Sequence, residues 1–149
     1  MTYTKIEKPL MHIIGIECRT SNASGQSFKD IPQHWERFYR EDISSQIPHR
    51  ISEDVVALYC DYVTDHTGAY SFVIGCPVSI AETVPEGMIL KTIPSGNYAL
   101  FQAIGDPSQS VVGTWQTIWN TDLSRTYSGD YEVYGTHSPE KVDIFVAVE

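Results

Sequence analysis

The chain has 149 residues, of which 42% are hydrophobic and 11% aromatic, a composition typical of one compact globular domain. Its formal charge of −9, from 19 acidic and 10 basic residues, argues against binding to nucleic acid, because contacts to phosphate rely on lysine and arginine. Three widely spaced cysteines indicate neither a disulfide scaffold nor a zinc site, and the absence of a signal peptide or a long apolar run predicts a soluble cytoplasmic protein away from membranes.

The first half of the chain predicts the order strand, helix, strand, strand. The expected elements are a strand at 10–16, a loop at 20–27, a helix ending near residue 43, and strands at 55–62 and 70–78 joined as a hairpin. Asp30 and Pro32 mark the start of the helix, since aspartate can satisfy free backbone amides and proline is tolerated in a first turn.

The second half predicts the same order again. The expected elements are a short strand at 88–93, a strand at 98–104, a helix, and strands at 131–134 and 142–148 joined by residues 135–140. Ser108 or Ser110 is expected to cap the helix.

A repeated aromatic pattern links the two predicted helices. The matching positions are Trp35 and Trp115, Tyr39 and Trp119, Asp42 and Asp122, and Ile43 and Leu123. One strand-helix-strand-strand unit cannot bury its apolar face alone, whereas two related units can pack together and leave a cleft at their seam. We therefore predict a single α+β domain over 1–149, with an antiparallel sheet, two internal repeat units at about 10–79 and 88–149, and a central cleft.

Glu132 is the first candidate for a functional residue. Strand alternation places Glu132 and Tyr134 on one face of their strand, and Tyr131 and Val133 on the other. If Tyr131 and Val133 face solvent, Glu132 lies under the helices, where a cationic guest or a tyrosine donor should complete it. The alternative is an exposed carboxylate above a core formed by Tyr131 and Val133.

Four aromatic residues of the helices are the next candidates: Trp35, Tyr39, Trp115 and Trp119. Aromatic faces attract organic cations and stack on planar ligands, although such a stripe can equally be part of the core. The histidines lack metal-ligand spacing, and no phosphate-binding, dinucleotide-binding or G-x-S-x-G motif is present, so we expect no metal, no cofactor and no catalytic residues from these motif classes.

Four segments, in the right order, resemble the GyrI-like family, also called the bacterial transcription activator effector-binding domain. The segments are 93–101, the helix around Trp115, Trp119 and Leu123, residues 129–134, and 142–148. The resemblance implies two tandem units around a cleft and a buried glutamate, here Glu132, that recognises lipophilic cations. The fused regulators of that family carry a DNA-binding region that this sequence lacks, so direct contact with DNA is not expected.

The favoured hypothesis is a protein that binds a hydrophobic or aromatic, cationic small molecule in the cleft between the two repeats, for transcription regulation or drug sequestration. The expected ligand-binding residues are Glu132, Tyr134, Trp119, Trp115, Tyr98, Trp35 and Tyr39. One alternative is a hydrolase of reactive electrophiles, with Glu132 as general acid or base beside Tyr98 or Tyr134. Another is a protein-binding module, with gyrase or a transcription regulator as the partner.

Overall fold

A computed structural model describes residues 3–135 and 140–149, so that most of the predicted connection at 135–140 lies outside the described residues. The strands are β1 (Thr4–Lys8), β2 (Met11–Ser21), β3 (Val55–Cys60), β4 (Ala69–Val78), β5 (Ile89–Ile93), β6 (Gly96–Ile104), β7 (Asp130–Tyr134) and β8 (Lys141–Val148). The helices are the short 3-10 turn η1 (Ala23–Gly25), α1 (Gln26–Arg40), α2 (Ile43–Gln46) and α3 (Pro107–Trp119). The predicted α+β class and antiparallel sheet are confirmed.

All of these strands belong to one antiparallel sheet with the order β1-β6-β8-β7-β3-β4-β2-β5. The series β2-α1-β3-β4 recurs as β6-α3-β7-β8, and the two series meet where β3 pairs with β7. The outermost strands are exchanged, since β1 pairs with β6 and β5 pairs with β2. The strand predicted at 88–93 therefore extends the sheet beside the first series, and β1 forms where no strand was expected.

The boundaries of the helices differ from the prediction. Helix α1 begins at Gln26, so Pro32 lies inside it rather than in its first turn. This proline removes a hydrogen bond to the carbonyl of Phe28, a loss that is tolerated on the exposed side of the helix. Helix α1 ends at Arg40, because Asp42 adopts a left-handed conformation with φ 49°.

Helix α3 has a different cap from the predicted Ser108 or Ser110. The Asp106 side chain accepts a hydrogen bond from the Ser108 N–H at 3.0 Å, and Pro107 occupies the first turn. This arrangement satisfies an otherwise free backbone amide at the start of the helix.

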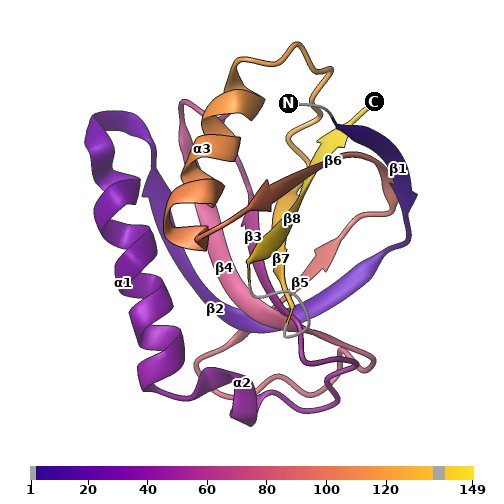
Figure 1. The fold of residues 1–149 in the computed structure, drawn as a ribbon. Helices are drawn as coiled ribbons and strands as arrows, with labels where there is room; N and C mark the ends of the chain where they lie inside the picture. The colour runs from indigo at the N-terminus through magenta and orange to yellow at the C-terminus, as the bar shows by residue number, and fades with distance from the viewer. Residues whose placement is uncertain (1–2, 136–139) are drawn as a thin grey trace.

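Both faces of the sheet are buried. Helices α1 and α3 lie next to each other on one side of it (Figure 1), where α1 covers one cluster of apolar side chains and α3 covers another. On the other face the side chains pack on one another because the sheet curls, as Tyr98, Tyr131 and Phe145 do. Within the described residues, no helix has both the length and the apolar character needed to cross a membrane.

Candidate functional site

A cavity of about 390 Å³ lies between α1 and α3, above β3 and β7; we call it the α1–α3 cavity. Its size falls in the range of roughly 300–1,000 Å³ that is typical of small-molecule sites. Its walls are formed by Asn22, Ser27, Phe28, Ile31, Pro32, Trp35, Tyr59, Tyr62, His66, Tyr70, Pro107, Ser108, Val111, Val112, Trp115, Gln116, Trp119, Arg125, Glu132 and Tyr134. The lining is therefore mainly aromatic and aliphatic, with few charged groups.

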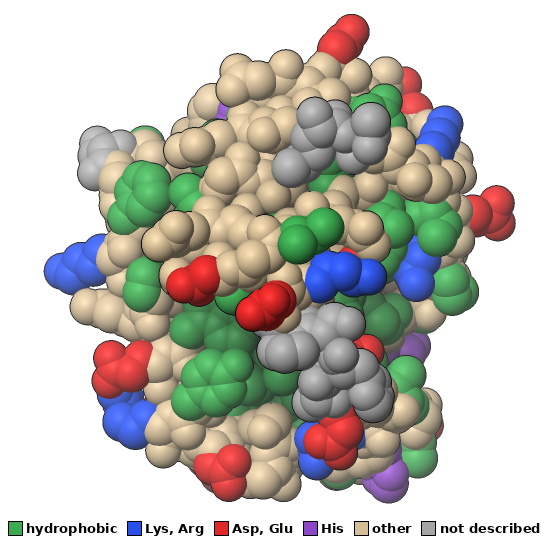
Figure 2. Space-filling view, viewed as in Figure 1, with side chains coloured by type: hydrophobic (Ala, Val, Ile, Leu, Met, Phe, Trp, Pro, Cys, Tyr) green, Lys and Arg blue, Asp and Glu red, His purple; other side chains and the backbone are tan. Residues whose placement is uncertain are grey.

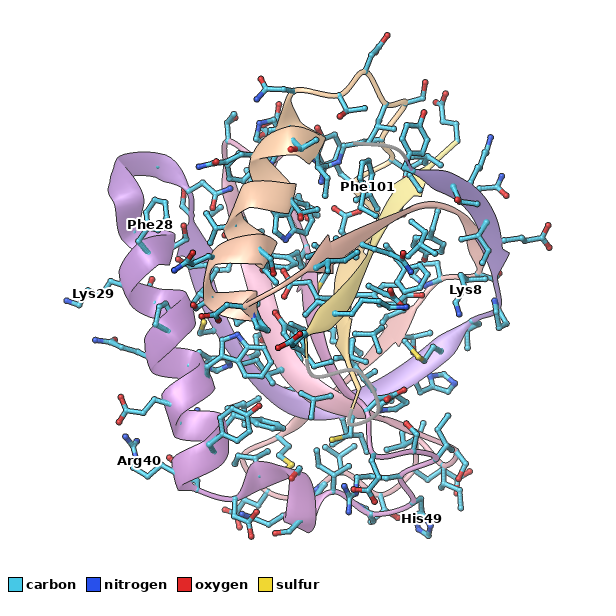
Figure 3. The ribbon with its side chains drawn as sticks, in the orientation of Figure 1. Lys8, Phe28, Lys29, Arg40, His49 and Phe101 are labelled. Carbon is cyan, nitrogen blue, oxygen red and sulfur yellow. The ribbon has the colours of Figure 1, made fainter. Side chains whose placement is uncertain are left out.

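The mouth of the cavity carries exposed apolar side chains. Phe28 on α1 and Val112 and Trp119 on α3 all line the cavity and are all exposed. In Figure 3, Lys29 and Arg40 point from α1 away from the molecule, and Figure 2 shows acidic and basic side chains spread singly over this face, with apolar side chains exposed between them. The helices thus direct their charges outward and leave an apolar entrance.

Glu132 projects from β7 into this apolar environment and is only 1% exposed. Its Oε2 accepts hydrogen bonds from the hydroxyl of Tyr59 and from Nε1 of Trp115, both at 2.7 Å. Its Oε1 accepts one from the hydroxyl of Tyr134 at 2.6 Å. Across the sheet Glu132 pairs with Ala57, whose small side chain leaves room above the strand.

All three donors to Glu132 are neutral. Within the described part of the chain, no lysine or arginine forms an ion pair with this carboxylate. Burial raises the pKa of Glu132, and the hydrogen bonds from Tyr134, Tyr59 and Trp115 only partly oppose that rise. When ionised, Glu132 is a negative charge stabilised by dipoles alone.

Asp130, the other buried carboxylate of β7, has a different environment. It is 0% exposed, and its Oδ2 accepts hydrogen bonds from Nη2 of Arg125 at 2.7 Å and from the hydroxyl of Tyr62 at 2.6 Å. Its Oδ1 accepts the N–H of Ala147 at 2.8 Å. Asp130 is thus neutralised by a cation and tied to the backbone of β8.

Aromatic rings surround the carboxylate of Glu132. Tyr134 meets Trp35 edge to face at 4.9 Å between centroids, and Tyr59 meets Trp115 in the same way at 5.1 Å. These contacts fix the hydroxyl and indole donors, since each ring is held by a neighbour as well as by its hydrogen bond. No group of three or more potential metal ligands occurs within residues 3–135 and 140–149.

The structure brings five of the seven predicted site residues together: Glu132, Tyr134, Trp115, Trp119 and Trp35 all line the cavity. Tyr39 does not line it; it is 66% exposed and stacks on the far side of Trp35 at 5.9 Å. It lies one helical turn beyond Trp35, past the end of the cavity.

The placement of Tyr98 in the site is wrong. Tyr98 is buried in the core on the opposite face of the sheet, where its hydroxyl donates to the carbonyl of Pro94. The side chains of β6 alternate, and it is Ala99 and Phe101 that face α3.

The reason given for the burial of Glu132 also needs correction. Tyr131 does not face solvent; it is buried in the core on the far side of the sheet. Glu132 is nevertheless buried, because the sheet is covered on both faces at this point.

Sequence reasoning missed Tyr59, Tyr62, Asp130 and Arg125. Tyr59 on β3 pairs with Asp130 on β7 and is therefore diagonal to Glu132. Knowledge of this strand pairing would have indicated Tyr59 as a neighbour of Glu132. Asp130 shares the face of Glu132 through the two-residue period of the strand. Arg125 lies in the irregular segment before β7 and carries no periodic signal.

Comparisons with known proteins agree on one family. A profile of the family Cass2, integron-associated effector binding protein, matches residues 6–148. The Bacillus subtilis protein YobU, named as a candidate transcriptional regulator, is 30% identical over 149 residues, which cover 94% of this chain and 93% of YobU.

Solved structures share the fold. The integron cassette protein VCH_CASS2 from the mobile metagenome of Vibrio cholerae matches with a TM-score of 0.78 and 27% identity, over 100% of this chain and 97% of that protein. SAV2435, solved with tetraphenylphosphonium bound, matches with a TM-score of 0.83 and 16% identity, over 100% of this chain and 94% of its own.

Proposed function

Because the chain belongs to the family of integron-associated effector-binding proteins, we propose that it binds lipophilic aromatic cations in the α1–α3 cavity, with Glu132 as their counter-charge. The observation that carries this proposal is that, among residues 3–135 and 140–149, Glu132 is paired with neutral donors alone. A buried carboxylate without a cationic partner is costly, and a cationic guest offsets that cost while neutral ligands of the same shape do not.

The walls of the cavity support the same class of ligand. Trp35, Tyr59, Trp115 and Tyr134 present rings around the carboxylate, and ring faces attract organic cations whose charge is spread over an apolar body. The structural relative SAV2435 is bound to tetraphenylphosphonium, a lipophilic cation of this kind. The lining has few other charged groups, so selectivity is expected to rest on charge and apolar size rather than on a specific hydrogen-bonding pattern.

Calorimetry with two matched probes tests the proposal. Tetraphenylphosphonium carries a positive charge on an aryl body, whereas triphenylphosphine oxide is a neutral molecule of similar composition. We expect the wild-type protein to bind the cation more tightly than the neutral probe. Glu132→Gln should lower the affinity for the cation by about tenfold or more and have little effect on the affinity for the neutral probe.

The control is Glu36→Gln, which removes the same charge from an exposed site on α1. This variant should bind the cation as the wild-type protein does. Equal affinity of the wild-type protein and Glu132→Gln for tetraphenylphosphonium would remove Glu132 from the site.

A further inference from the structure

Arg125 occupies a site that resembles the one offered to a guest. Its guanidinium bonds to the buried carboxylate of Asp130 at 2.7 Å and lies over the ring of Tyr127 at 4.4 Å. The Arg125 side chain is only 6% exposed. Carboxylate and aromatic ring thus hold a cation here that belongs to the protein itself.

Arg125 and Tyr62 separate Asp130 from the α1–α3 cavity. Both line the cavity and both donate to Oδ2 of Asp130, which is itself fully buried. The Nε of Arg125 has no acceptor among the described residues. The arginine is therefore held by its charge and by Tyr127 more than by a full set of hydrogen bonds.

Two carboxylates two residues apart on a strand are about 7 Å from each other. With Arg125 in place, Glu132 is the single carboxylate among the described residues that line the cavity, and its hydrogen-bond donors are neutral. Without Arg125 there would be a second, from Asp130, at a spacing that matches the two charges of a short rigid dication.

We propose that Arg125 is a specificity-determining residue, a built-in cation that limits the guest to one positive charge. This inference rests on the proposed binding of cations at Glu132. A second cationic centre on the guest must lose its hydration without gaining a carboxylate, and it meets the positive charge of Arg125. The protein therefore selects monocations over dications of the same shape.

A pair of probes with one aromatic frame tests this selectivity. Methyl viologen carries two positive charges on a bipyridine frame. N-methyl-4-phenylpyridinium carries one positive charge on a frame of nearly the same shape. We expect the wild-type protein to prefer the monocation by about tenfold or more, and Arg125→Gln to reduce that preference by at least about tenfold.

Two controls isolate the charge of Arg125. Arg125→Lys keeps a cation beside Asp130 and should retain the wild-type preference. Arg40→Gln removes a positive charge from an exposed position on α1 and should also retain it. An unchanged ratio of the two affinities in Arg125→Gln would show that Arg125 is only a structural partner of Asp130, and the inference would be overturned.

A second variant covers the case in which Arg125→Gln does not fold. Asp130→Asn leaves Arg125 unpaired beside the cavity, so affinity for the monocation should fall by about tenfold or more while neutral phenylpyridine binds as before. Equal losses for both probes would overturn the inference. Glu132→Gln separates the two proposals. If this variant keeps the wild-type affinity for the monocation, the proposed function fails as well. If it lowers that affinity while Arg125→Gln leaves the charge preference unchanged, this inference alone is overturned.

Discussion

Asp130 and Glu132 lie two residues apart on β7 and project from the same face of the sheet, yet in the described part of the chain only Asp130 has a cationic partner. Asp130 also accepts a backbone N–H from β8, which makes it part of the frame of the protein. Glu132 is held by phenol and indole groups, which stabilise its charge without neutralising it. The same strand therefore supplies one structural carboxylate and one that we propose as the counter-charge of a guest.

Binding of cations is expected to depend on pH through Glu132. Burial raises the pKa of this carboxyl, so it takes up a proton at a higher pH than the value of about 4.3 for a glutamate in water. Affinity for tetraphenylphosphonium should be complete above the raised pKa and should fall as the pH drops through it. Calorimetry across this range measures the change.

The neutral probe and the Gln variant complete this pH experiment. Triphenylphosphine oxide should bind equally well throughout, and Glu132→Gln should give a flat profile for both probes. A wild-type profile for the cation that is also flat would contradict the assignment of the charge to Glu132.

Removal of the charge at Glu132 is expected to stabilise the free protein. Because the folded-state pKa is raised, the contribution of this group to stability is complete below the unfolded pKa and is lost as the pH rises through the folded pKa. At neutral pH the ionised carboxyl is therefore a cost, which Glu132→Gln removes while keeping an acceptor for Tyr59 and Trp115. The Tm should rise by a few degrees, since about 1 kcal/mol corresponds to ~2–4 °C at this size.

Thermal unfolding at two pH values measures this stability effect. The gain should be present at neutral pH and should disappear in acid, where the wild-type carboxyl is also uncharged. A lower Tm for Glu132→Gln at neutral pH would show that the hydrogen bonds of the carboxylate outweigh its desolvation. In that case Glu132 would be a stabilising residue of the core.

The sequence predicted the order of elements well because β-branched runs and the helical stripe report local periodicity. Membership of the effector-binding family confirms the resemblance seen in the sequence. Strand β1 was missed because Ile6 is its single apolar residue and the strand lies at an edge of the sheet, where most of its side chains are exposed. The hydrolase and gyrase-binding interpretations stay predictions.

The site could be predicted only in part. Alternation assigns Glu132 and Tyr134 to one face, but it does not say which face of a strand the helices cover. This is why Tyr98, which lies on the opposite face of the sheet, was expected among the ligand-binding residues. Arg125 could not be found, since its role depends on a long-range contact from an irregular segment. Patterns report what lies along one element, whereas a cavity depends on how elements meet.

Two aromatic residues of α1 should differ in their effect on ligand binding. Trp35 lines the α1–α3 cavity beside Tyr134, whereas Tyr39, one turn later, is exposed outside it. Trp35→Ala should weaken the binding of tetraphenylphosphonium by roughly 1–2 kcal/mol, because the cation loses its contact with the ring. Tyr39→Ala should change the affinity little. Similar losses in both variants, measured by calorimetry, would indicate a general effect on α1 rather than a direct contact.

Close packing of two glycines is expected to control the stability of the sheet. Gly15 on β2 pairs directly with Gly75 on β4, and a Cβ on Gly75 would overlap the carbonyl oxygen of Ile14. Gly75→Ala must push the two strands apart, so the free energy of unfolding should fall by about 1–3 kcal/mol.

Gly113 provides the matched control for this substitution. It lies in α3, where an added Cβ would meet no atom within 4 Å beyond its chain neighbours and the backbone of the helix itself. Gly113→Ala should therefore stabilise the protein by roughly 0.5–1 kcal/mol, because alanine loses less conformational freedom than glycine in a helix. Urea unfolding measures both variants. If Gly75→Ala were as stable as the wild-type protein, β2 and β4 would have room to separate. The close approach of these two strands would then not be required for the stability of the sheet.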